Sequence, residues 1–323
     1  MNSGRTELDY TTLIDLRVDY AFKLFFSNVN RLISLLNAIF AHKGLGRVVI
    51  ALTIVNPNLE REGEDNKLAI LDIRAKLSDG TTVCVEMHLH GIYELVSKVL
   101  YSWAKVYGME LKAGESYNTH QPTICIAFVN GAISDADGKP IRKTHSLFQL
   151  MEKDSHNVLT RNAEFHFINM KAFLMDLAKA DSANMDSFTK WLALITQHDI
   201  EDKDIINKIR EEDEFMEATA ELERMSMDAH VRLSYERRMM QLDSWNRMER
   251  ELAEEKALRR QLEEESKKYA KERIQFSKER MQSNKERNQA IKQLHKQGIS
   301  IGLIAGAYNM TEEEINALIN SPA

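Results

Sequence analysis

The sequence predicts an α/β domain followed by a long, charged helical extension. In the first half of the chain, a helix, a strand, a β-hairpin, a second helix and a further strand follow one another, which gives the order αβββαβ. In the second half, neither Gly nor Pro occurs between Pro140 and Gly298. A stretch this long without helix breakers, rich in Glu, Lys, Arg, Met, Leu and Ala, is typical of helices.

Composition limits the classes of protein that the chain can represent. Its 323 residues, 43% hydrophobic and 28% charged, suffice for one sizeable core plus an extension. The net charge of −6 excludes a general polyanion-binding surface, so any contact with nucleic acid must be local. Cys84 and Cys125 lie in apolar, strand-like runs and predict buried thiols rather than a disulfide framework or a zinc site. Because no apolar run reaches membrane length and no signal peptide is evident, we expect a cytoplasmic protein without a membrane partner.

The first predicted helix spans Asp15–Phe40 and carries Asp19 near its start. Two interpretations of Asp19 stay open: an acid favoured by the helix dipole and paired with Lys23 one turn later, or an acid that serves a site. A buried strand is expected at Arg47–Val55. The apolar stripe of the helix consists of Phe22, Phe25, Phe26, Val29, Leu32, Ile33, Leu36, Ile39 and Phe40.

The β-hairpin is formed by the runs Ile70–Ala75 and Thr81–Leu89, with Ser78-Asp79-Gly80 as turn residues between them. A three-residue loop closed at Gly80 pairs either Lys76 or Leu77 with Thr81, depending on the bulge.

One of these registers places Asp72 directly opposite Glu86, with their Cβ atoms about 4.5–5.5 Å apart. A two-residue Asp79-Gly80 loop would instead send the two carboxylates to opposite faces. Along the second strand, Glu86, His88 and His90 share one face, because side chains alternate.

Two carboxylates held side by side repel each other unless a proton or a cation lies between them. Oxygen ligands at this spacing suit Mg²⁺, Mn²⁺ or Ca²⁺. The simpler alternative is that Asp72 and Glu86 are solvent-facing strand residues, but their apolar neighbours favour a site. A further alternative is a transition-metal site for Mn, Fe or Zn made by Glu86, His88 and His90.

Several segments resemble those of the PD-(D/E)XK nuclease family transposases, also called recombination-promoting nucleases. Asp19 to Phe26 (DYAFKLFF) resembles the opening D-x-x-FK-x-x-F segment of that family. Leu71-Asp72-Ile73-Arg74-Ala75 and Val85-Glu86-Met87 are similar to its LD(V/I)RA and (I/V)EMQ segments. Tyr101, Gly114–Tyr117 and Pro122–Ile126 resemble its helix, its G-x-x-Y turn and its next core strand, so the resemblance covers roughly the first half of the chain.

The resemblance implies a restriction-endonuclease-like αβββαβ core with a mixed sheet, and a metal-dependent DNA endonuclease that hydrolyses phosphodiester bonds in transposition or recombination. Asp72 and Glu86 would be the metal-binding carboxylates, and Asp19 an auxiliary metal-binding acid. His88 stands where the superfamily has Lys and this branch usually has Gln, and it would orient or deprotonate the attacking water. Mg²⁺ is the expected ion, with Mn²⁺ or Ca²⁺ as alternatives, and DNA is the expected partner.

The alternative function is a catalytically degenerate nuclease fold that serves as a nucleic-acid-binding or protein-interaction module. His88, the acidic net charge and the long helix motivate this alternative.

Three domains are expected: a nuclease-like domain at 1–200, a charged helical extension at 201–296, and a small helix-turn-helix-like unit at 297–323. In the first, we expect a helix at Glu94–Leu111, strands at Thr123–Val129 and Asn162–Met170, and a pair of helices within Ala172–Thr196. His145, His156 and His166 have no ligand spacing and are interpreted as ordinary surface or packing residues.

The extension gives only a weak coiled-coil signal, because the heptad series Leu262, Tyr269 and Phe276 ends at Ser283. A homodimer formed through this helix therefore stays an open alternative. The stretch 267–296 is basic, but its interleaved glutamates favour a solvated helix with internal ion pairs over phosphate contact. Beyond it, the capping box at Thr311–Glu314 begins a last helix whose three glutamates disfavour DNA, so this unit is interpreted as a docking unit.

Overall fold

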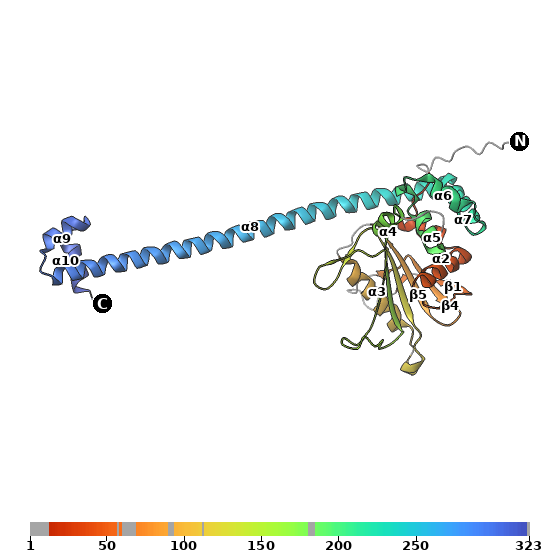
Figure 1. Ribbon diagram of the computed structural model, residues 1–323, viewed down its shortest axis with the longest axis horizontal. Coiled ribbons are helices and arrows are strands. Elements are labelled where there is room, and N and C mark those ends of the chain that lie inside the picture. Colours follow the sequence, from red (N-terminus) through yellow and green to blue (C-terminus); the bar gives the residue numbers. More distant parts are fainter. Residues whose placement is uncertain are drawn as a thin grey trace. The chain divides into compact units, whose positions relative to one another are not determined.

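The computed structural model describes residues 13–56, 58–59, 69–89, 94–111, 113–179 and 185–321. The chain divides into two compact units, Met1–Glu249 and Arg250–Ala323, which are described separately below. Figure 1 shows the elements that each unit contains.

A six-stranded mixed sheet forms the centre of the first unit, in the order β1-β4-β5-β6-β10-β9. Strands β5, β6 and β10 run parallel to one another, and the other neighbouring strands pair antiparallel. This sheet confirms the predicted α/β class. Its strands are β1 (Leu52–Val55), β4 (Ile73–Leu77), β5 (Thr82–His88), β6 (Thr123–Val129), β9 (His145–Gln149) and β10 (Ala163–Asn169). Two short ribbons join β2 (Asn58–Leu59) to β3 (Ala69–Ile70), and β7 (Ile133–Ser134) to β8 (Pro140–Ile141).

Helices cover both faces of the sheet, as Figure 1 shows for α3 on one side and α2 and α5 on the other. The alternation of side chains along β5 sends Val85 into the larger core and Cys84 into the smaller core beneath α3. Trp191 lies fully buried in the larger core against Phe26 and Phe215. The helices of this unit are α1 (Asp19–Phe25), α2 (Val29–His42), α3 (Leu95–Met109), α4 (Met170–Leu177), α5 (Ser187–Ile195), α6 (Lys203–Arg210), α7 (Asp213–Met227) and the first part of α8 (Ala229–Lys296).

The single helix predicted at Asp15–Phe40 is wrong, since the segment forms α1 and α2, which meet at 106°. The break occurs because Asn28 takes an extended backbone conformation and caps α2, its side-chain oxygen accepting from the N–H groups of Asn30 and Arg31. The apolar stripe continues across the break, which is why the periodicity does not reveal it. Among the described residues no single helix is long and apolar enough to cross a membrane. The bent pair α1 and α2, taken together, reaches that length and apolar composition.

Replacing Asn28 with Ala should lower the free energy of unfolding by about 1 kcal/mol, because two N–H groups of α2 lose their acceptor. Urea unfolding of the two proteins measures the difference. Asn30→Ala is the matched control, since Asn30 lies in the same turn and contributes only its backbone N–H to the cap. An equal loss in both variants would show that the cap is not responsible.

The buried strand predicted at Arg47–Val55 is also wrong, because β1 begins only at Leu52 and, as an edge strand, is only partly buried. Val48 and Ile50 are 72% and 77% exposed. Val49 alone is buried there, and the side chain of Asn37 in α2 accepts from its N–H at 2.7 Å and donates to its C=O at 2.9 Å. The chain before β1 therefore takes its hydrogen bonds from α2 instead of from a neighbouring strand.

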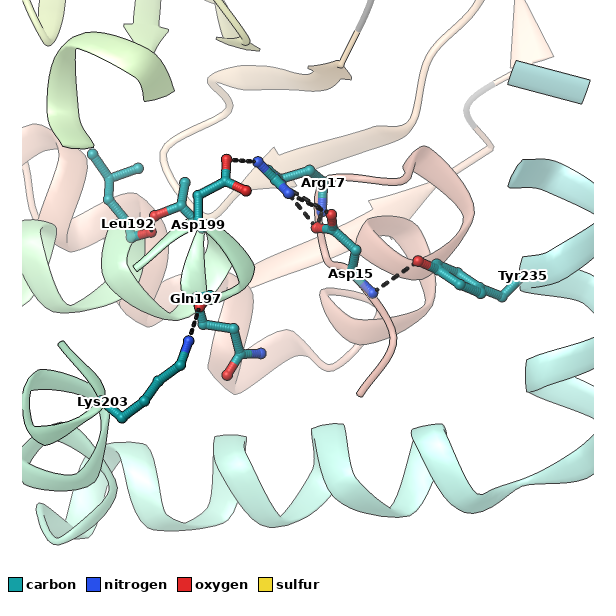
Figure 2. Close-up of polar contacts among 8 residues, drawn as sticks. Asp15, Arg17, Leu192, Gln197, Asp199, Lys203 and Tyr235 are labelled. Atoms are coloured by element: carbon teal, nitrogen blue, oxygen red, sulfur yellow. Dashed lines mark hydrogen bonds and ion pairs between the residues drawn. The ribbon is translucent and has the colours of Figure 1, made fainter. Parts of the chain in front are cut away.

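The segment before α1 is fixed by a buried charge cluster, shown in Figure 2. Arg17 binds Asp15 and Asp199, and these carboxylates outweigh the effect of burial and raise the pKa of the guanidinium. The hydroxyl of Tyr235, near the start of α8, accepts from the N–H of Asp15 at 3.2 Å. Tyr235 and Met239 also pack against the larger core, so the beginning of α8 belongs to the first compact unit.

The second unit holds the rest of α8, together with α9 (Ile301–Tyr308) and α10 (Glu312–Asn320). Its small core consists of Ile291, Ile304, Ala305 and Ile315. The predicted capping box is confirmed: Thr311 accepts from the N–H of Glu314, whose carboxylate accepts in return from the N–H of Thr311.

Candidate active site

The loop of the central hairpin fixes which residues of its two strands face each other. Leu77 donates its N–H to the C=O of Thr81 at 2.8 Å, and Gly80 closes the three-residue loop with φ of +89°. The register that follows pairs Ile73 with Val85. The printed pairing ends there, and continuing this register by one residue sets Asp72, just before β4, opposite Glu86.

Asp72 is only partly exposed, and one of its oxygens is already engaged. Its Oδ2 accepts from the N–H of Met87 at 2.7 Å. Burial raises the pKa of Asp72 to about 6, and the charges of Asp19 and Glu86 act in the same direction. The N–H of Met87 and the ammonium of Lys23 oppose this effect without cancelling it. The carboxyl group is therefore poised to lose its proton near neutral pH or to gain a cation.

Glu86 is buried, and its charge is balanced by two basic side chains. Its Oε2 lies 3.0 Å from Nε2 of His88 and 3.1 Å from Nζ of Lys98 in α3. Burial alone would raise the pKa of Glu86, but His88 and Lys98 outweigh burial and hold it below the ordinary value. Apart from this contact, Nε2 of His88 has no hydrogen-bond partner among the described residues.

Asp19 is the first residue of α1, and its carboxylate is paired with Arg238 of α8. Nε of Arg238 donates to Oδ1 at 2.7 Å, and Nη2 contacts Oδ2. Among the described residues Asp19 forms no ion pair with Lys23, so the pairing considered from the sequence is not present. Asp19 is nevertheless close enough for its charge to raise the pKa of Asp72.

The donor set fits a hard divalent cation that keeps much of its own hydration. Asp72 and Glu86 offer carboxylate oxygens from facing strands, and Oδ1 of Asp72 accepts no hydrogen bond from a described residue. Within the described ranges no group of three or more His, Cys, Asp or Glu side chains is arranged to hold a metal ion. Mg²⁺ commonly uses only one or two carboxylates and completes its shell with water and substrate phosphate. His90, the third member of the transition-metal set considered above, lies outside the described residues.

His145 and His166 are packing residues, as one of the two sequence interpretations holds, but the sequence does not predict that they contact each other. Nε2 of His145 lies 2.9 Å from Nδ1 of His166, and both side chains are buried on the neighbouring strands β9 and β10. Burial lowers the pKa of His145 to about 2 and also lowers the pKa of His166. The pair is therefore neutral and belongs to the core. His156 is exposed, as predicted.

Two basic residues near the carboxylates are not recognisable as site residues from the sequence. From the sequence alone, Lys98 is either a residue that lines a phosphate path or a solvated lysine. Its contact with Glu86 depends on how α3 packs against β5. Arg238 is 219 residues away from Asp19 in the sequence. No local pattern connects residues so far apart.

Comparison with known proteins identifies one family. A family model described as PD-(D/E)XK nuclease family transposase matches residues 16–251, more than half of the 323-residue chain. The match includes Asp19, Asp72, Glu86 and His88, and Arg238 as well. No curated protein and no solved structure matches the chain.

Proposed function

The chain belongs to the PD-(D/E)XK nuclease family transposases, and on this premise we propose that it is a divalent-metal-dependent DNA endonuclease acting in transposition or recombination. Its substrate is the phosphodiester backbone of DNA. Asp72 and Glu86 hold the ion, for which we propose Mg²⁺ first and Mn²⁺ or Ca²⁺ as alternatives.

The observation that carries the proposal is the register of β4 and β5, which pairs Ile73 with Val85 and, continued by one residue, sets the partly exposed Asp72 opposite the buried Glu86. Burying two acids side by side costs stability unless a cation compensates them. Burial is the main cause of the raised pKa of Asp72, about 6, and the charges of Asp19 and Glu86 add to it.

When bound, a divalent ion polarises the scissile phosphate and lowers the pKa of an attacking water. The protein contributes orientation and charge. His88 orients or deprotonates the water from the same strand face as Glu86, and Lys98 keeps Glu86 ionised at 3.1 Å. Asp19 is the proposed auxiliary acid, and its carboxylate is bound by Arg238 in the metal-free protein.

Purified full-length protein should nick supercoiled plasmid in the presence of Mg²⁺ or Mn²⁺, and EDTA should stop the reaction. Ca²⁺ is tested beside them. Asp72→Ala is the first control, because it removes a proposed metal ligand. It also removes the acceptor of the Met87 N–H, so the fold of the variant must be checked. Circular dichroism of the variant establishes that it is folded.

The outcome separates the two functions considered for this fold. Nicking that depends on the metal and is lost in Asp72→Ala supports the endonuclease. A folded protein that nicks with none of the three metals, or an Asp72→Ala variant as active as the parent chain, contradicts it. If the folded protein nicks with none of the three metals, DNA binding that survives EDTA would favour a nucleic-acid-binding module.

A further inference from the structure

The exposed part of α8 contains a short internal repeat. The pattern Lys-Glu-Arg-x-Gln occurs three times, at residues 271–275, 278–282 and 285–289, all within the helix. The interval of seven residues is close to two helical turns. Each residue type therefore forms its own line along α8, and consecutive residues lie about 100° apart around the axis. We call residues 271–289 the KER segment.

The repeat separates the charges around the helix. Lys271, Lys278 and Lys285 form one line, which Lys267 extends at one end. Lys292 follows at the other end, but it donates to the C=O of Ser321 at 2.7 Å. The three glutamates follow on a neighbouring side, and the three arginines lie roughly opposite the lysines. All six basic side chains of the KER segment are exposed.

Internal ion pairs do not explain these charges. On a helix, ion pairs form between residues three or four apart. Lys278 has Ile274, Gln275, Met281 and Gln282 at those positions, and neither Lys271 nor Lys285 has an acid there. Two of the three glutamates have other partners, because Glu279 accepts from Gln275 at 3.0 Å and Glu286 accepts from Gln282 at 2.6 Å. Glu272 lies four residues after Lys268, which is outside the KER segment.

Earlier in α8 the usual arrangement does occur, with Arg259 lying 3.4 Å from Glu263. The solvated helix with internal ion pairs expected from the sequence therefore does not describe the KER segment. Its lysines and arginines form no ion pair with any described residue.

The charge of this stretch is opposite to that of the whole chain. Residues 267–296 carry ten Lys and Arg against three Glu, whereas the chain has a net charge of −6. Like charges four residues apart, as at Lys267 and Lys271, destabilise a helix by about 0.2–0.5 kcal/mol. Lys267 has Glu263 and Glu264 at ion-pair spacing, but the basic side chains of the KER segment itself keep their charges without an ion pair to any described residue, which fits a polyanion.

We propose that the lysine line of the KER segment binds the phosphate backbone of duplex DNA without reading its sequence. Equivalent lysines are about 10.5 Å apart along the helix axis, a length that spans about three phosphates of one DNA strand. This inference rests on the proposed function, which supplies DNA as the substrate, and it assigns the extension a role in holding that substrate.

A membrane surface fits the KER segment less well. A helix that lies on a membrane needs a continuous apolar side. The exposed aromatic residues Tyr269 and Phe276 share their side of α8 with Arg273 and Arg280, which interrupt it. Binding to anionic lipid is therefore an outcome that the experiment must exclude.

The test is fluorescence anisotropy of a labelled 30-base-pair duplex with the full chain in EDTA, titrated with NaCl. Lys271→Gln, Lys278→Gln and Lys285→Gln are combined in one variant. The matched control combines Glu272→Gln, Glu279→Gln and Glu286→Gln, which changes the same three repeats. Gln, Lys and Glu have similar helix propensities, so both variants should keep α8 intact.

The lysine variant should bind on the order of 100-fold more weakly at 0.1 M salt, with a salt slope smaller by about 2.7, since each lost phosphate contact removes about 0.9. The glutamate variant should bind at least as tightly as the parent chain. Equal affinity and slope for the lysine variant and the parent chain would overturn the inference. So would binding of the parent chain to phosphatidylserine vesicles without binding to the duplex.

The plasmid assay keeps this inference separate from the proposed function. Lysine-dependent binding in EDTA from a chain that does not nick with any metal would remove the endonuclease and leave the DNA-binding surface. Metal-dependent nicking by a chain whose DNA binding is insensitive to the lysine substitutions would support the endonuclease and remove the DNA-binding role of the KER segment.

Discussion

Asp72→Asn should make the metal-free protein more stable while reducing nicking on the order of 10³-fold. The pKa of Asp72, about 6 against an ordinary 3.8, means that keeping this side chain ionised costs the folded state about 3 kcal/mol at pH 8. Asn carries no charge and its oxygen can still accept from the N–H of Met87. The cost should therefore disappear in the variant, and its free energy of unfolding should rise by about 2–3 kcal/mol.

The pH dependence of this gain follows from the sign of the pKa shift. A raised pKa means that the folded state holds the proton more tightly than the unfolded state, so the parent chain loses stability as pH rises from about 4 to about 6. The difference between parent and variant should be absent below pH 4 and complete above pH 6. Urea unfolding across this range measures it, and Asp137→Asn, an exposed turn residue, is the control that should show no difference.

Titration with Mg²⁺ or Mn²⁺ links the stability measurement to the site. The parent chain should gain about 2.7 kcal/mol when the free ion reaches a hundred times its dissociation constant, because the ion binds only the folded state. The Asp72→Asn variant lacks a ligand charge and should gain little. If this substitution left both the stability of the metal-free protein and its response to metal unchanged, Asp72 would not be a buried ligand.

The central hairpin is the part of the fold that the sequence predicts best, and the reason is local. Ser78-Asp79-Gly80 permits few turns, and the alternation on either side of it permits few registers, so the pairing of Asp72 with Glu86 could be anticipated as one of them. The mixed sheet is expected from the family resemblance and not from this alternation, which does not set the direction of neighbouring strands.

What the sequence does not predict depends on contacts between distant segments. The break at Asn28 is hidden because the residues on both sides of it enter one core. Strand β9 is not predicted, and neither is the contact of His145 with His166, because β9 is short and pairs only with β10 among the described strands. The pairing of Arg238 with Asp19 requires the start of α8 to return to α1 across most of the first unit. Local propensity carries no information about such a return.

Lys98→Gln should lower the rate of nicking about 10²-fold, the usual effect of removing one charged group that is aimed at a reacting centre. Lys98 supplies a positive charge to Glu86 from α3, at 3.1 Å, although its side chain is 53% exposed. The superfamily that this chain resembles has a Lys two residues after the second acid, where this chain has His88. Lys98 is placed to supply from the helix the positive charge that the strand lacks.

A pH profile distinguishes this role from a structural one. Lys98 helps to hold the pKa of Glu86 below its ordinary value, so its removal should raise that pKa toward the value of Asp72, about 6. The acidic limb of the nicking profile should then become steeper, because two carboxyl groups lose their protons over the same pH range. Lys98→Arg should restore part of the rate, because it restores the charge, and His88→Gln should cost less than Lys98→Gln. Lys171→Gln, the same chemical change at an exposed position of α4, is the control. A Lys98→Gln protein with the rate and profile of the Lys171→Gln protein would leave His88 as the basic residue on which cleavage depends.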